Sequence, residues 1–282
     1  LFFGTGIPAC IIIINKNNFR SVNKIFMINA EKGFIKDGAK NILQDKDVKK
    51  IFDTYKTKKE INSYSRLIDI EEIKSNNYNL NISSYIPIDY KEKFEDIDAH
   101  FRGGIPDKEL DEFNEYWSKF SSLKNEFFKK QRNGYKDLRF PSNELYEKIL
   151  NHKDFSDYKK DRQLHFEKFY EKTSLELIKL TIGIKPKEKI VNISNQLLKH
   201  YQEADLVDSY EIYQELMDCW QEVMSDDFYY ISSLGWKINI YRIIEKSKKG
   251  KEKDKGWECD LLPKSLLISK FYLNKKNEID NL

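Results

Sequence analysis

Residues 206–224 read LVDSYEIYQELMDCWQEVM and form the clearest periodic pattern in the chain. Large apolar side chains recur there every three or four residues, the spacing that places them on one face of an α-helix. A seam with a period of about 3.5 residues is typical of helices that pack against other helices. A stripe of aromatic and methionine side chains is more often a packing face than a cofactor site, and we favour internal packing over contact with a second subunit. The candidate subunit interface on this seam, which runs from Leu206 to Met224, consists of Tyr210, Tyr213, Met217 and Trp220.

The sequence before and around this seam also predicts helices. Only 11 Gly and 6 Pro occur among 282 residues, which favours helices over a turn-rich β fold. Aromatic residues make up 14% of the chain, which argues against global disorder. We therefore predict a mainly α fold with a bundle-like helical domain over residues 89–282. Within it, helices are predicted over 107–131, where Asn133-Gly134 would end the helix, and over 145–150, 155–180 and 190–201.

Residues 1–88 have a different pattern. Ala9–Ile14 and Lys24–Asn29 are continuous apolar runs, which are typical of strands buried on both faces of an α/β sheet. The two runs could pair as a hairpin with a long loop, but two strands alone leave both faces exposed, so we expect further strands to complete the sheet. After them, the sequence predicts a short strand over 65–68 and a helix over 47–60 with an apolar stripe of Val48, Ile51, Phe52 and Tyr55.

Several classes of protein are excluded by simple counts. The three cysteines form no CxxC pair, which argues against a disulfide framework or a zinc site and favours a reducing cytoplasm. The longest apolar run, Ile7–Ile14, is far shorter than the ~20 residues that a membrane-spanning helix needs. The four histidines never stand at ligand spacing, and no spacing singles out a nucleophile or a pair of carboxylates. We therefore predict no catalytic, cofactor-binding or metal-binding residue in this chain.

Two basic clusters stand out against a net charge of only +3. Residues 246–255 are rich in lysine, and a mobile surface loop is favoured there over a nucleic-acid contact. In the other cluster, cations are interleaved with Tyr135 and Phe140, a pattern that suits phosphate contacts combined with base stacking. The same pattern also arises where Lys and Arg favour the C-terminal end of a helix dipole. The candidate DNA-binding residues are Lys129, Lys130, Arg132, Lys136 and Arg139.

Four ordered segments resemble the modification (M) subunit of type I restriction-modification systems. The opening LFFGTGIPACIIIINKN, residues 1–17, is similar to a family stretch close to LFYGTGIPACILVLNKNK. Lys24–Ala30 resembles the next strand of the family, and Ile51–Lys59 with Tyr64-Ser65-Arg66 resembles the segment after it. Ile73–Tyr85 is close to the family pattern EIxxNxYNLNIxxY. The region from Tyr213 to Tyr272 resembles the extended C-terminal part of one branch of these subunits more loosely.

This resemblance implies a DNA methyltransferase that uses S-adenosylmethionine to methylate adenine at N-6. It implies that residues 1–88 are the C-terminal end of a Rossmann-like methyltransferase domain, and that the partners are a specificity (S) subunit, a second M subunit, a restriction (R) subunit and double-stranded DNA. In the family, the glycine-rich turn and the Asn-Pro-Pro-Tyr loop lie before the opening segment, and Leu1 itself suggests a piece of a longer protein. We therefore expect S-adenosylmethionine to serve the intact parent and not to bind this segment, and we carry over no catalytic residue.

Three functions remain open from the sequence. The leading hypothesis is a cytoplasmic C-terminal fragment of an M subunit that serves subunit assembly and DNA clamping. The second is a helical protein-protein interaction module without DNA contact. A complete enzyme of another class is the least favoured, because the two apolar runs lack partner strands.

Overall fold

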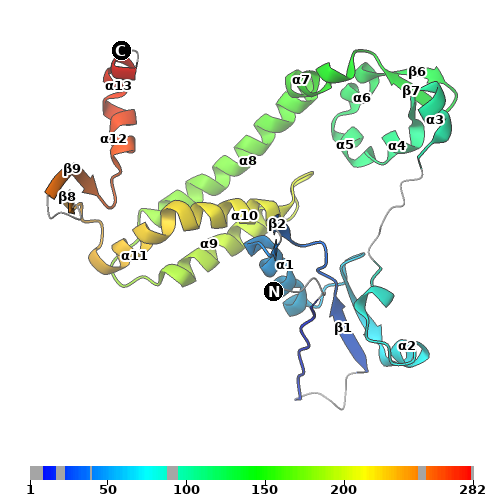
Figure 1. Ribbon diagram of the computed structural model, residues 1–282, viewed down its shortest axis with the longest axis horizontal. Coiled ribbons are helices and arrows are strands. Elements are labelled where there is room, and N and C mark those ends of the chain that lie inside the picture. The colour runs from blue at the N-terminus through cyan, green and yellow to red at the C-terminus, as the bar shows by residue number, and fades with distance from the viewer. Residues whose placement is uncertain (1–8, 17–22, 39, 88–94, 247–251, 281–282) are drawn as a thin grey trace. The chain divides into compact units, whose positions relative to one another are not determined.

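The computed structural model describes residues 9–16, 23–38, 40–87, 95–246 and 252–280. These residues are mainly helical, as predicted, with small antiparallel sheets (Figure 1). The chain divides into two compact units, each considered by itself below. The first unit is Leu1–Leu164 with Glu203–Gln214, and the second unit is His165–Gln202 with Glu215–Leu282. The predicted domain boundary at residue 88 falls outside the described residues.

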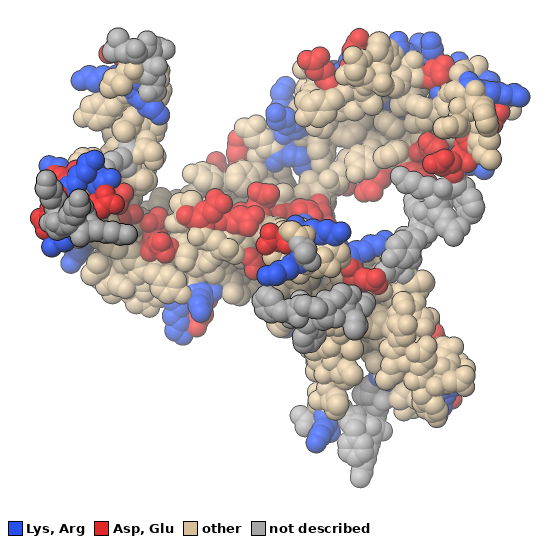
Figure 2. Space-filling view, viewed as in Figure 1, with Lys and Arg blue, Asp and Glu red and all other residues tan. Residues whose placement is uncertain are grey.

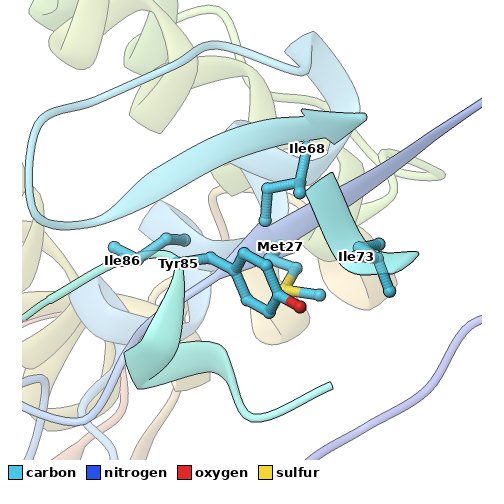
Figure 3. Packing of buried hydrophobic residues seen from close by; sticks show 5 residues of the cluster. All are labelled: Met27, Ile68, Ile73, Tyr85 and Ile86. Atoms are coloured by element: carbon cyan, nitrogen blue, oxygen red, sulfur yellow. The ribbon is translucent and has the colours of Figure 1, made fainter. Parts of the chain in front are cut away.

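The first unit opens with a two-stranded antiparallel sheet. β1 (Lys24–Ile28) pairs with β4 (Ser65–Asp69), so that Phe26 lies opposite Leu67. A small core packs on this sheet and contains Met27, Ile68, Ile73, Tyr85 and Ile86 (Figure 3). The remaining elements of this region are β2 (Ile35–Asp37), β3 (Lys40–Ile42), α1 (Asp45–Thr57), α2 (Ile70–Ser75) and the 3-10 helix η1 (Ile82–Ser84).

The first predicted strand is wrong in this structure. Residues 9–16 form no strand, and the four isoleucines Ile11–Ile14 are 60–81% exposed. The predicted hairpin is wrong as well, because β1 pairs with β4 instead. Nor is β1 buried on both faces, since only Met27 among its residues is buried. The physical reason is that no strand among the described residues lies beside Ile11–Ile14 to provide a hydrogen-bonding ladder. The Rossmann-like sheet therefore stays a prediction.

Helix α1 agrees with its predicted range, but its apolar stripe does not face a core. Val48 and Phe52 are 52% and 56% exposed. The face that packs inside the unit carries the buried Thr54 instead. The amphipathic pattern thus predicts the presence of the helix correctly, but it is wrong about which side of the helix is buried.

The predicted single helix over 107–131 is also wrong. It is three short helices followed by a strand, and the backbone leaves the helical region at Phe120 (φ −115°, ψ 55°). Phe120, Leu123 and Phe127 form one core, and Trp117 from before the break and Phe128 from the strand pack against it. Asn133-Gly134 forms the turn of a hairpin, with Gly134 at φ +80°. The elements are α3 (Ile97–Arg102), β5 (Ile105–Pro106), α4 (Asp107–Asp111), α5 (Asn114–Lys119), α6 (Ser121–Phe127), β6 (Phe128–Arg132) and β7 (Tyr135–Leu138), with strand order β5-β7-β6.

The later helices follow the sequence pattern closely. The apolar positions predicted for the helix around 190–201 are all buried in α9 (Pro186–Tyr201), namely Ile190, Ile193, Leu197 and Tyr201. The seam of residues 206–224 lies largely on α10 (Ser209–Cys219) and on a π-helical turn, η3 (Trp220–Met224). The other helices are η2 (Ser142–Glu144), α7 (Leu145–Asn151), α8 (Lys153–Leu177) and α11 (Ser225–Leu234).

The lysine-rich segment near the C-terminus was predicted as a loop and is partly strand. β8 (Ile240–Lys246) and β9 (Glu252–Cys259) form an antiparallel hairpin, and residues 247–251 between them lie outside the described residues. Cross-strand ion pairs explain the difference, since Lys246 lies 3.0 Å from Glu252 and Lys255 lies 2.9 Å from Glu245. The chain continues as α12 (Lys264–Phe271) and α13 (Leu273–Asp280). In the described part of the chain, no helix combines the length and apolarity that crossing a membrane would take.

Candidate nucleic-acid interface

The five candidate DNA-binding residues all lie on the β6–β7 hairpin or directly after it. Lys129, Lys130 and Arg132 belong to β6, Lys136 belongs to β7, and Arg139 follows β7. The hairpin therefore places these five residues in one short segment, while their role in DNA binding stays a prediction. On the face drawn in Figure 2, however, basic side chains are interspersed with acidic ones and form no uniform basic surface.

The register of the hairpin divides the cations between its two faces. Lys130 lies opposite Lys136, so these two side chains share one face. Lys129 lies opposite Asp137 on the other face, and Arg132 lies opposite Tyr135 beyond an irregularity in the ladder. Because neighbouring residues of a strand point to opposite sides, the five cations cannot contact one stretch of phosphates together.

Arg132 is occupied inside the protein. Its guanidinium stacks on the Tyr135 ring at 3.5 Å from the ring centroid. Its Nη2 donates to Asp98 Oδ2 at 2.9 Å, and its Nη1 donates to the carbonyl oxygen of Gly103 at 2.6 Å. This set of contacts fastens the hairpin to α3 and the loop that follows it.

Tyr135 extends this connection to the start of α3. Its hydroxyl donates to Asp96 at 2.9 Å, while Asp96 also accepts the Ala99 N–H as the N-cap of α3. The backbone N–H of Ala99, followed by the Tyr135 hydroxyl, holds the pKa of Asp96 below its ordinary value. We call the set Asp96, Asp98, Arg132 and Tyr135 the α3 clasp. Sequence reasoning missed its two aspartates. The sequence signal in this region is the pair Gly103-Gly104, which forms a turn between α3 and β5 with both residues at positive φ.

The other candidate cations differ in whether they contact a partner within the protein. Lys136 lies 3.6 Å from Asp107, and the Arg139 Nε donates to the carbonyl oxygen of Phe128 at 3.2 Å. Lys129 and Lys130 are exposed and make no ion pair within the described ranges. These two lysines are therefore the strongest remaining candidates for contacting phosphates.

The candidate subunit interface is largely engaged in packing. In the first unit, the Tyr210 hydroxyl lies 3.4 Å from Asp53 of α1, and burial, with the charge of Asp53, raises the pKa of Tyr210 to about 12. Burial also raises the pKa of Tyr213. In the second unit, Met217 is buried and the Trp220 ring packs edge-on against Phe228 at 5.0 Å. All four side chains are thus at least partly buried, while a role in subunit contact stays a prediction.

Further contacts connect α10 to α1. Lys46 Nζ lies 2.6 Å from Glu211, and its backbone N–H donates to the buried Gln214 at 3.0 Å. The Lys50 ammonium lies 4.8 Å and 5.9 Å from the ring centroids of Tyr64 and Tyr210. Among the residues that the structure describes, no group of three or more His, Cys, Asp or Glu side chains could hold a metal ion.

Part of the chain is similar in sequence to known proteins. Residues 1–94 match the family N-6 DNA Methylase. The chain is 39% identical over 130 residues to the type I restriction enzyme MjaVIII methylase subunit of Methanocaldococcus jannaschii, a match that covers 44% of this chain and 21% of that protein. It is 28% identical over 113 residues to the MpnII methylase subunit of Mycoplasma pneumoniae, covering 39% and 21%.

One solved structure also matches a part of this chain. The methyltransferase subunit of a type I restriction-modification system from Streptococcus thermophilus is 37% identical over 24% of this chain and 14% of its own, with a TM-score of 0.23. The family match and the curated relatives confirm the sequence resemblance to type I modification subunits. The aligned part of the chain corresponds to about a fifth of the length of these curated relatives.

Proposed function

We propose that this chain, whose residues 1–94 match the N-6 DNA methylase family, is the C-terminal part of a type I modification subunit. The whole protein would transfer a methyl group from S-adenosylmethionine to adenine N-6 in DNA. This part would serve subunit assembly and DNA clamping, together with a specificity subunit, a second modification subunit and a restriction subunit. The match of residues 1–94, supported by relatives whose names are those of type I methylase subunits, is the observation that carries the proposal.

The exposed segment Ile11–Ile14 supports the proposed place in a larger sheet domain. Four consecutive isoleucines that are 60–81% exposed are costly to leave in water, since burying each side chain is worth about 1.5–3 kcal/mol. An apolar run of this kind suits a central strand covered on both faces. We therefore propose that this segment pairs within the Rossmann-like sheet of the whole protein.

DNA clamping would rest on Lys129 and Lys130. These two are exposed and carry no ion pair to any described residue, whereas Arg132 and Lys136 are paired with Asp98 and Asp107. The internal use of Arg132 and Lys136 favours the second candidate, a helical interaction module without DNA contact. A direct measurement of DNA binding separates the two.

The test is the salt dependence of binding to a fluorescent DNA duplex, followed by anisotropy. Each phosphate contact that is lost lowers the slope of log affinity against log salt by about 0.9. Because Lys129 and Lys130 point to opposite faces of β6, one of them is expected to contact a phosphate at a time, so K129Q/K130Q lowers this slope by about 1, whereas the matched pair K159Q/K160Q on α8 does not. Equal slopes for the wild type and both variants, or no binding at low salt, would favour the interaction module.

A further inference from the structure

A cavity of about 580 Å³ lies in the first unit, where the end of α6 meets α7 and the residue after it. Two aromatic rings, those of Phe127 and Phe140, line it together with three carboxylates and one imidazole, and Lys148 and Asn151 complete the lining. We propose that this cavity binds an arginine side chain presented by a partner polypeptide. This inference is independent of the proposed methyltransferase role. The polar residues concerned are Glu126, Glu144, Glu147 and His152.

The aromatic wall of the cavity is closely packed. Phe127 is 4% exposed, and its ring meets the Phe140 ring edge-on at 4.9 Å and 89°. The His152 ring meets Phe127 edge-on at 5.6 Å. The accessible part of such a packed aromatic surface can receive a planar cation.

The imidazole is held in one orientation beside a carboxylate. The side chain of His152 is only 8% exposed, and its Nδ1 accepts the backbone N–H of Asp154 at 3.1 Å. Nδ1 is therefore an acceptor, so the proton of the neutral ring is on Nε2, which lies 3.3 Å from Glu126. Glu126 thus receives a hydrogen bond from His152 through Oε2, and its other oxygen can accept from a guest.

The protein already places one cation against this wall. Lys148 Nζ lies 5.0 Å from the Phe140 ring centroid and 3.4 Å from Glu144. This pair shows that the ring and the carboxylate beside it suit a positive group. Glu126 and Glu147 make no ion pair with a lysine or arginine in the described part of the chain, so the cavity retains an excess of negative charge.

The chemistry of the cavity selects among possible guests. A nucleic-acid phosphate would be repelled by the three carboxylates. A metal ion is disfavoured, because no group of three ligating side chains is close enough among the described residues. A guanidinium stacks flat on an aromatic ring while the five donors at its edge reach two carboxylates, a planar arrangement that favours it over the compact ammonium of lysine.

The test uses N-acetylargininamide as the probe and N-acetylcitrullinamide, its neutral counterpart of nearly the same shape, as the control. The chain contains only 4 histidines, so carbon-13 labelling of their rings gives a simple NMR spectrum. The His152 signal is assigned by its loss in H152Q. We expect the arginine compound to shift the His152 signal in a saturable manner and the citrulline compound to leave it in place.

Variants make the outcome specific to the cavity. E126Q and E147Q each weaken binding by about two- to fivefold, the range for exposed ion pairs, whereas E109Q on α4 leaves it unchanged. K148Q strengthens binding by a similar factor, because it removes the internal competitor for Phe140. The proposal is overturned if both compounds shift His152 equally, if neither gives a saturable shift, or if affinity is the same in all four variants.

Discussion

The guanidinium of Arg132 lies 3.5 Å from the centroid of the Tyr135 ring, and both residues reach from the β6–β7 hairpin to aspartates of α3. A residue chosen from the sequence as a DNA contact is thus a structural contact inside the first unit. Basic side chains near aromatic ones are ambiguous in sequence, because the same pair can bind a phosphate or hold two parts of a chain together.

Removing the Arg132 side chain is expected to destabilise the protein more than it weakens DNA binding. R132A breaks charge-assisted bonds to Asp98 and to the Gly103 carbonyl oxygen, so the free energy of unfolding should fall by about 2 kcal/mol. Urea unfolding followed by circular dichroism measures this change. A stability equal to that of the wild type, with a large loss of DNA affinity, would show that Arg132 contacts DNA instead.

The carboxylate of Asp154 is expected to make stability depend on acid pH. It accepts the Ser122 hydroxyl at 2.7 Å and the backbone N–H groups of Ser122 and Leu123, which hold its pKa below the ordinary 3.8. A lowered pKa in the folded state means that this stabilisation is present above pH 3.8 and is lost as the pH falls through the folded value. D154N should therefore unfold more easily at neutral pH and show a shallower loss of stability in acid, measured by urea titrations across this range. Parallel pH profiles for wild type and D154N would contradict this.

At alkaline pH, Tyr210 is expected to make the stability of the protein fall as the pH rises. Burial is the main cause that raises its pKa from 10.0 to about 12, with the charge of Asp53 adding to it. A raised pKa means that the stabilisation is complete below pH 10 and is lost as the pH rises towards 12. Y210F should lose less stability than the wild type in that window, as followed by thermal unfolding, and phenolate absorbance should show one fewer late-titrating tyrosine. Y170F, which removes an exposed tyrosine of α8, is the matched control.

Much of the second unit could be predicted from sequence because its pattern is local. The four apolar positions of α9 recur with helical spacing, and all four are buried. The middle of the first unit could not be predicted in this way. Phe113, Phe120 and Phe127 fit one helical face, yet the chain bends at Phe120 to bring rings from different segments into a single core. Tertiary packing overrode local preference there.

The candidate site shows the same difference between features set by local sequence and features set by tertiary contacts. Sequence alone placed Lys129 and Lys130 near aromatic residues, and the structure leaves them exposed. It could not show that Arg132 is paired, because Asp98 lies 34 residues away along the chain and meets it only through the fold. Likewise, the ladder irregularity between Lys130 and Arg132, which sets the position of Arg132 opposite Tyr135, carries no clear sequence signal.

The core of the first sheet is expected to depend on one isoleucine. Ile68 has 0% exposure and packs with Met27 and Tyr85, so I68A should lower the free energy of unfolding by about 3 kcal/mol. I25A, on the partner strand at 37% exposure, should cost clearly less. Urea unfolding of both variants checks the order, and an equal cost would indicate that Ile25 is covered in solution.

The exposed isoleucines provide the sharpest test of the proposed place in a larger sheet. Ile12 is 76% exposed in this chain, so I12T should change its free energy of unfolding by less than about 0.5 kcal/mol. In a longer protein that carries the rest of the proposed sheet domain, the same side chain would be buried, and I12T would cost about 2 kcal/mol or more because a hydroxyl replaces packed methylene groups. Urea unfolding of I12T in both lengths of protein measures this difference. A cost that is equally small in both would show that Ile11–Ile14 is not a strand of that sheet.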